Sequence, residues 1–145
     1  MEKIYLILLI GLTVSYDASA AVSYALKHCA SGTYNSKYIS YPGNDCANFV
    51  SQCLIAGGQS LSGCPGVNKN GCVPLVSNLR SCLAQKGWKS SNTRPAGFKA
   101  GYPMIYGNDH AVLATTVNGG TIKYSAHSND RCNNGFYGSP TYYYR

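Results

Sequence analysis

A cysteine at the start of a predicted helix is the residue of this chain best placed to act as a nucleophile. Cys46 follows a turn at Pro42-Gly43-Asn44 and opens an apolar stretch that ends at Gly57-Gly58, a pattern that predicts a short helix. The positive end of the helix dipole stabilises a thiolate in the first turn, and the thiolate is the reactive form of cysteine. We therefore expect Cys46 to be a catalytic nucleophile; the alternative is that it is one more disulfide partner.

A cysteine nucleophile needs a base, usually histidine, and the base needs an orienting group. The chain has three histidines. His28 lies off the apolar stripe of a predicted helix near the start of the chain, and we interpret it as a surface residue. His110 and His127 lie on two neighbouring predicted strands, residues 109–117 and 121–128, which a turn at Asn118-Gly119-Gly120 joins into a hairpin. We expect His110 to be the base.

The length of the hairpin turn decides which side chains share a face with His110. A two-residue turn at Asn118-Gly119 sets His110 opposite His127, and a turn at Gly119-Gly120 sets it opposite Asn129. Both registers place these three residues on one face, whereas a three-residue loop would bring Asp130 there instead. The orienting group is therefore open among His127, Asn129 and Asp130. A lone strand histidine is more often structural, but here it coincides with a cysteine at a helix start.

These residues together predict an acyl-enzyme mechanism. The Cys46 thiolate attacks an amide carbonyl, and His110 protonates the leaving amine and then activates water. The Cys46 backbone N–H would hold the oxyanion with a second donor, for which Asn44, Asp45 and Tyr41 lie near enough in sequence. We expect Asp45 chiefly to cap the helix.

The elements that must position these residues change type along the chain. Helical patterns cover residues 16–29, with Val22, Ala25, Leu26 and Cys29 on one stripe, then the Cys46 helix, then residues 73–87. Between them lie loops at 30–45, where Tyr34, Tyr38 and Tyr41 either wall a groove or pack the loop, and at 59–74. Strand patterns follow at 102–106, 109–117 and 121–128, with one or two more near Tyr137 and at 141–144. Helices followed by an antiparallel sheet predict an α+β fold.

Seven cysteines in a small chain indicate disulfides. If Cys46 stays free, the other six are enough for three bridges, and the loop between Cys64 and Cys72 favours a local bridge there. The cysteine spacing lacks the paired knuckles of zinc sites, so we expect neither a metal nor another cofactor.

The first fifteen residues resemble an export signal, since Lys3 precedes an apolar run and small residues follow. We expect a signal peptide at residues 1–15, with cleavage as late as residue 20, and one domain at 16–145 that is secreted and has no membrane anchor.

The net charge of +7 favours anionic partners such as bacterial walls. The basic residues are scattered, so a nucleic-acid groove is not indicated. The oligomeric state is left open.

Four segments resemble the putative amidase domain of exported bacterial proteins, a family related to the CHAP and NlpC-type cysteine peptidases and amidases. These segments are Tyr16 to Ala25, the motif Asn44-Asp45-Cys46-Ala47-Asn48-Phe49-Val50-Ser51-Gln52-Cys53-Leu54, Asp109-His110-Ala111-Val112, and His127 to Arg131. The resemblance implies a papain-like core that hydrolyses an amide bond, with bacterial peptidoglycan as substrate. It implies Cys46 as nucleophile, His110 as base and a third polar residue from the His127–Asp130 segment.

The chain departs from the family in its cysteines. Cys53 lies inside the motif, where it resembles a small buried residue that need not be bridged, and the remaining extra cysteines suggest an exported version used against bacteria.

Two other functions compete with a peptidoglycan amidase. One is a general cysteine peptidase that acts on peptides, and the other is a catalytically silent module that binds cell walls or glycans through its tyrosines.

Overall fold

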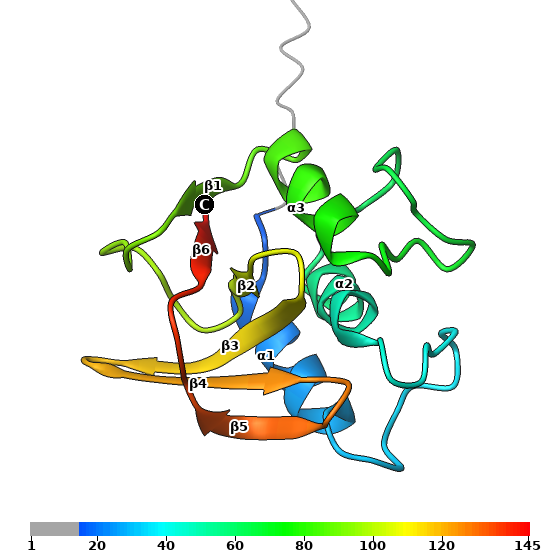
Figure 1. Ribbon diagram of the computed structural model, residues 1–145, viewed down its shortest axis with the longest axis horizontal. Coiled ribbons are helices and arrows are strands. Elements are labelled where there is room, and N and C mark those ends of the chain that lie inside the picture. The colour runs from blue at the N-terminus through cyan, green and yellow to red at the C-terminus, as the bar shows by residue number, and fades with distance from the viewer. Residues whose placement is uncertain (1–14) are drawn as a thin grey trace, which may run out of the picture.

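The computed structural model describes residues 15–145 (Figure 1). The expected signal peptide therefore lies outside the described residues, apart from Ser15. In the part of the chain that is described, no helix is both long and apolar enough to span a membrane.

Three helices come first, as the sequence predicts: α1 at Ala18–His28, α2 at Cys46–Ala56 and α3 at Val76–Gln85. The expected stripe of α1 is wrong in part, because Leu26 is exposed and the buried face consists of Ala18, Ala21 and Ala25. These small side chains let the helix approach the rest of the fold closely. At Gly101 (φ +96°) an added Cβ would lie 2.4 Å from the Ala18 carbonyl oxygen.

Six strands follow and form one antiparallel sheet in the order β1-β6-β2-β3-β4-β5. Their bounds are Lys89–Ser91 (β1), Pro103–Tyr106 (β2), His110–Asn118 (β3), Thr121–Ala126 (β4), Arg131–Gly135 (β5) and Thr141–Tyr144 (β6). Sequence reasoning missed β1, since Lys-Ser-Ser has no apolar alternation and forms a strand only by pairing with β6. The α+β fold is confirmed.

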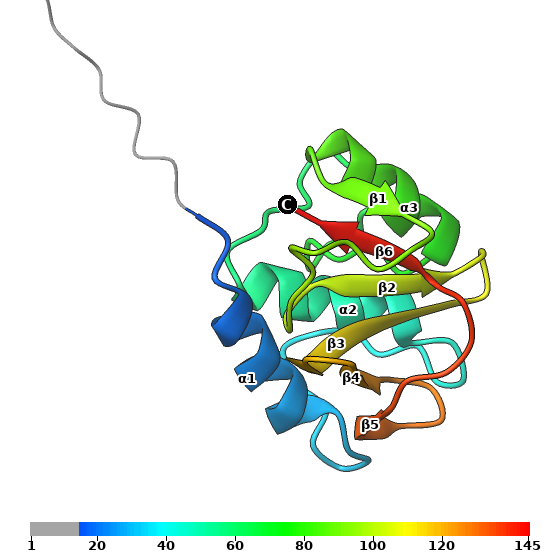
Figure 2. The same cartoon turned by 90° about the vertical axis from the view of Figure 1, so that its left-hand side faces the viewer.

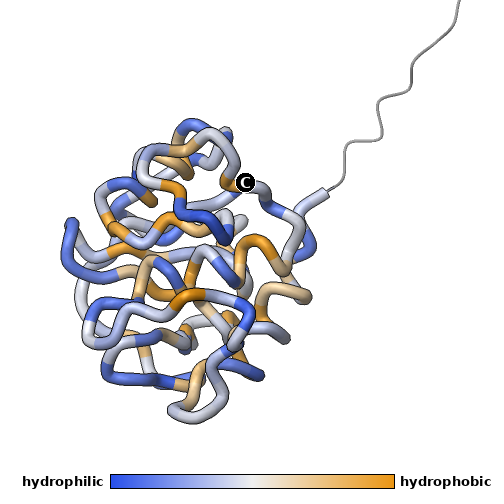
Figure 3. The backbone as a smooth tube through the Cα atoms, turned by 90° about the vertical axis from the view of Figure 1, so that its right-hand side faces the viewer, coloured by the Kyte–Doolittle hydropathy of each residue, from blue (hydrophilic) through white to orange (hydrophobic). Residues whose placement is uncertain are grey.

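The helix that carries Cys46 lies at the centre of the fold. Every residue of α2 from Cys46 to Leu54 is buried, because the helix is enclosed by α1, α3 and the sheet. Figure 2 shows α2 and α3 behind the strands and α1 beside them. The strongly polar stretches of the tube in Figure 3 lie mainly on peripheral loops. A helix buried on all sides holds its first residue in a fixed position.

The β3–β4 hairpin contains an irregularity that changes its register. Gly119-Gly120 forms the turn, so Asn118 pairs with Thr121, but a bulge at Thr115 shifts the pairing so that Leu113 lies opposite Ser125. A bulge adds one residue to one strand and so reverses which side chains share a face beyond it. The predicted sharing of one face by His110, His127 and Asn129 is therefore wrong.

Two disulfides join distant parts of the chain, Cys29 with Cys132 and Cys64 with Cys82. The expected Cys64–Cys72 bridge and the count of three bridges are both wrong. Cys82 is available to Cys64 because it lies on the buried face of α3. Cys72 is held elsewhere: its N–H donates to Asn68 Oδ1 (3.0 Å), and the following N–H, of Val73, donates to Ser51 Oγ (3.0 Å).

Candidate active site

Cys46 is the first residue of α2, and its thiol is free. Its side chain is 3% exposed. The first N–H groups of a helix have no acceptor within the helix, so those of Cys46 and Ala47 are oriented to bind negative charge. Cys46 therefore combines a nucleophilic atom with oxyanion donors on one helix turn.

Asp45 fixes the backbone immediately before Cys46. Its N–H donates to Ser128 Oγ (2.6 Å), and its Oδ1 accepts from the Tyr41 N–H (2.8 Å) and from Asn48 Nδ2 (2.9 Å). Asp45 precedes α2 directly, but its side chain makes no capping hydrogen bond to the helix backbone. The expectation that Asp45 chiefly caps the helix is wrong, because its carboxylate ties the 41–45 turn to the helix and to a histidine.

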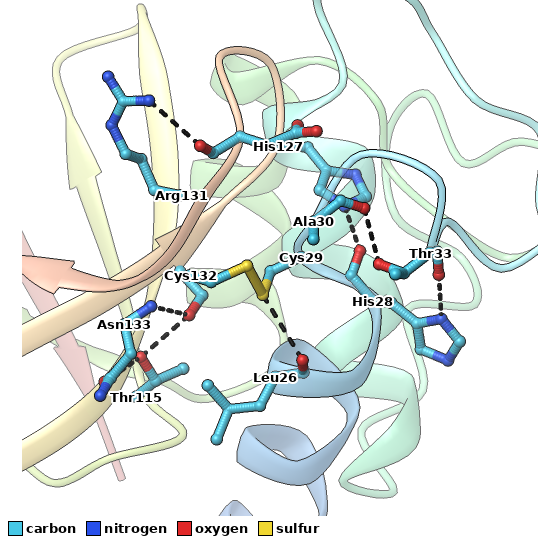
Figure 4. Close-up of a disulfide and its surroundings, with 12 residues drawn as sticks. Leu26, His28, Cys29, Ala30, Thr33, Thr115, His127, Arg131, Cys132 and Asn133 are labelled. Carbon is cyan, nitrogen blue, oxygen red and sulfur yellow. Dashed lines mark hydrogen bonds between the residues drawn. A yellow bond between two sulfur atoms is a disulfide. The ribbon is translucent and has the colours of Figure 1, made fainter.

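That histidine is His127, which is 1% exposed. Its Nδ1 lies 2.6 Å from Asp45 Oδ2, and its Nε2 lies 2.7 Å from the His28 carbonyl oxygen at the end of α1 (Figure 4). Phe49 stacks on one side of the ring at 3.8 Å between centroids, and Tyr34 stacks at 3.7 Å. The imidazole is thus held by two polar contacts and two aromatic rings.

These contacts fix what His127 can do. A carbonyl oxygen only accepts, so Nε2 carries a proton, and a second proton lies between Nδ1 and Oδ2 of Asp45. Neither ring nitrogen is free to accept a proton from Cys46 or to bond to His110. The geometry therefore excludes His127 as the group that hydrogen-bonds and orients His110, and it makes His127 a positioning residue that holds Asp45 before Cys46.

His110 begins β3 and is half-buried, and this burial lowers the pKa of its imidazole. The ring packs near Tyr106, its partner on β2, at 6.4 Å between centroids. The pairing of β3 with β4 ends at Leu113 and Ser125, so His110 lies beyond the hairpin register and pairs with Tyr106 on β2. The start of β3 and the start of α2 lie at the same end of the sheet (Figure 2).

The other expected site residues do not converge on His110. Asn129 is exposed in the turn after β4 with φ 66°, and its carbonyl accepts from Arg131 (3.1 Å). Asp130 accepts a hydrogen bond from the Tyr34 hydroxyl. Within the described residues, the His110 ring has no hydrogen-bond partner, so the alternatives Asn129 and Asp130 are not found as its orienting group either.

The two further oxyanion candidates are placed by the turn before α2. Asn44 is exposed, and its N–H donates to the Tyr41 carbonyl (2.9 Å). The Tyr41 hydroxyl accepts from Asn68 Nδ2 at 3.1 Å. Asn44 is therefore open to a ligand, whereas the Tyr41 hydroxyl ties its loop to the 59–74 loop.

Two more free thiols, those of Cys53 and Cys72, lie in the protein interior. Burial raises the pKa of Cys53 well above its ordinary value, and burial with the nearby Asp45 charge raises the pKa of Cys72 to about 12. Both thiols therefore stay protonated at neutral pH. Neither therefore supplies the thiolate that a nucleophile requires.

A cleft of about 620 Å³ opens beside Asp45. The loop before α2 forms one wall with Tyr34 and Pro42, and the turn from Ser128 to Asp130 forms the other. This volume is in the range of small-molecule sites. Sequence analysis considered Tyr34 either as a groove wall or as packing of the loop. It did not single out Ser128, since a serine in a turn gives no signal that it will bond a distant backbone N–H.

The described residues contain no group of three or more His, Cys, Asp or Glu side chains that could hold a metal ion. The groups at the site that could take part in chemistry are a thiol, imidazoles, one carboxylate and helix N–H groups. Such a set is suited to acyl transfer.

The described part of the chain thus has a free cysteine at the start of a central helix and a half-buried histidine at the start of β3, within an α+β fold. Residues 15–100 match the family described as "Putative amidase domain", which is well over half of the chain, so the chain belongs to this family. The matched range contains all three helices and Cys46 and ends before His110. No curated protein and no solved structure matches the chain. Membership of this family indicates an amidase-type hydrolase.

Proposed function

We propose that the chain is a secreted cysteine amidase of papain-like type that cleaves an amide bond in bacterial peptidoglycan. Cys46 Sγ bonds to the carbonyl carbon as its proton passes to His110, and the amine leaves with that proton. Water, activated by His110, then cleaves the thioester and returns the thiol. The Cys46 N–H at the start of α2 stabilises the oxyanion.

One observation carries this proposal: the free thiol at the first position of α2 lies within the range that matches the amidase family. Three others support it. The lowered pKa of His110 keeps its imidazole neutral and able to accept a proton. The cleft beside Asp45 is large enough for a peptide segment. The net charge of +7 favours an anionic wall polymer.

Secretion is supported by the apolar N-terminal run and by the two disulfides, which form in oxidising compartments. A protein that acts on bacterial walls from outside the cell would meet such conditions. An antibacterial role follows from this substrate.

The test is digestion of purified peptidoglycan, with new amino termini counted and the fragments weighed by mass spectrometry. We expect the native protein to release amino termini and Cys46→Ala to release none. Cys72→Ala, which removes another free thiol, is the matched control and should keep its activity. Release of termini from casein but not from peptidoglycan would instead support a general peptidase. Binding to peptidoglycan without any cleavage would support a silent wall-binding module.

A further inference from the structure

An exposed tyrosine is held flat beside the proposed base. Tyr137 is 50% exposed, and its ring lies parallel to that of Tyr106 at 4.7 Å between centroids and 4° between planes. The Tyr106 ring in turn packs near His110. We call Tyr137, Tyr106 and His110 the aromatic shelf.

The Tyr137 ring is fixed in place although much of it faces solvent. Tyr124 meets it edge-on at 5.7 Å, and the Tyr106 hydroxyl donates to the Tyr137 carbonyl at 2.5 Å. The next residue, Gly138 (φ +66°), packs so tightly on Tyr106 that an added Cβ would lie 3.3 Å from its ring. A ring that is ordered before binding loses little conformational entropy when a ligand stacks on it.

The shelf is continuous with the proposed catalytic groups. Tyr106 is the direct register partner of His110 across β2 and β3. A group that stacks on Tyr137 would therefore lie on the same aromatic surface as His110, the proposed base.

The shape of the shelf selects the kind of group that it can hold. Gly138 and Ser139, which follow Tyr137, are exposed and small, so neither forms an apolar wall beside the ring. An apolar peptide side chain is bound in concave pockets. A sugar ring has a flat face of C–H groups bordered by hydroxyls, which suits an open aromatic face with a hydroxyl at its edge.

We propose that Tyr137 is a substrate-binding residue that stacks on a sugar ring of the glycan strand next to the cleaved amide bond. The enzyme then selects peptides that are still attached to glycan over free peptides. This inference rests on the amidase function proposed above and names its substrate class.

The first experiment compares two substrates, a disaccharide-linked stem peptide and the same peptide without sugar. For Tyr137→Ala we expect kcat/KM to fall about tenfold on the sugar-linked substrate, as for other aromatic contact residues, and to stay unchanged on the free peptide. Tyr137→Phe keeps the ring and should retain the preference. Tyr144→Ala, which removes a tyrosine of β6 that pairs with Lys89 on the edge strand β1, is the control. An equal loss on both substrates, or no loss on either, would overturn the inference.

The second experiment needs no hydrolysis. Soluble β-1,4-linked N-acetylglucosamine pentamer is titrated into Cys46→Ala protein, and binding is followed by NMR chemical shifts. We expect saturable binding that weakens about tenfold when Tyr137→Ala is added. If the protein cleaves no amide bond but this binding is found, the proposed function fails and the sugar site stands. If it cleaves amide bonds and the pentamer does not bind, the sugar site fails alone.

Discussion

Replacing His127 with alanine should destabilise the protein far more than the position of His127 in a turn suggests. The substitution leaves Asp45 Oδ2 buried without its partner and leaves the His28 carbonyl without its donor. It also removes the ring packed between Tyr34 and Phe49. Breaking a buried ion pair by removing one partner costs about 3–5 kcal/mol. A domain of this size has about 5–15 kcal/mol in total.

Urea unfolding of the oxidised protein measures this cost. The only tryptophan, Trp88, is 5% exposed and reports unfolding by fluorescence. His28→Ala is the matched control, since its ring bonds only to the Thr33 carbonyl at the surface while its own carbonyl stays available to His127. We expect the control to lose about 0.5–1 kcal/mol.

A double-mutant cycle separates the ion pair from simple packing. In an Asp45→Ala background, His127→Ala no longer strands a buried carboxylate, so its cost should be smaller by more than about 1 kcal/mol. The reasoning is refuted if His127→Ala costs less than about 1 kcal/mol, or if its cost is the same in both backgrounds.

Three further predictions concern the thiols and the base. Iodoacetamide at neutral pH should label one of the three free cysteines of the native protein and none in Cys46→Ala. In denaturant all remaining thiols should react. Labelling of a second thiol in the native protein would contradict the argument that burial keeps Cys53 and Cys72 protonated. Because burial lowers the pKa of His110, kcat/KM should stay high as the pH falls through 6.5, the ordinary value, and decline only below it. The same shift means that the unfolded chain binds the proton first as the pH falls. The contribution of His110 to stability is therefore present above pH 6.5 and is lost below it. A decline of kcat/KM that already begins above pH 6.5 would refute the lowered pKa and with it both statements. Breaking the Cys29–Cys132 disulfide, as in Cys29→Ser with Cys132→Ser, should cost up to about 5 kcal/mol of stability, because the bridge closes a loop of 103 residues. The midpoint of urea unfolding measures this loss, and an unchanged midpoint would count against the prediction.

The central helix could be predicted from the sequence, because its signals are local. The turn at residues 42–44, the apolar run and the glycines that follow it set the start at Cys46 and the end at Ala56 without help from elsewhere. The free state of Cys46 also follows from local context. The pairing of the other cysteines does not, since Cys64 meets Cys82 only after α3 has packed.

The relation between the two histidines could not be predicted, because it depends on a third strand. Thr115 bulges where its hydroxyl meets Ser125 (3.0 Å) and Asn133 on β5 (3.0 Å). A hairpin considered alone gives no sign of β5, so residue counting from the turn keeps the wrong face. The same bulge explains why His127 bonds to Asp45 rather than lying beside His110.

The bridge between Cys29 and Cys132 also has a consequence for the order of folding. The partners of His127 lie 82 and 99 residues before it, and the disulfide closes over a similar distance just beyond it. Contacts of such high sequence separation form late, because the entropy of closing the long loop must be overcome first. A partly synthesised or incompletely oxidised chain would contain Cys46 but lack the fixed Asp45 that precedes it. The proposed nucleophile would therefore be correctly placed only in the final stage of folding, which would limit its chemistry to the completed molecule.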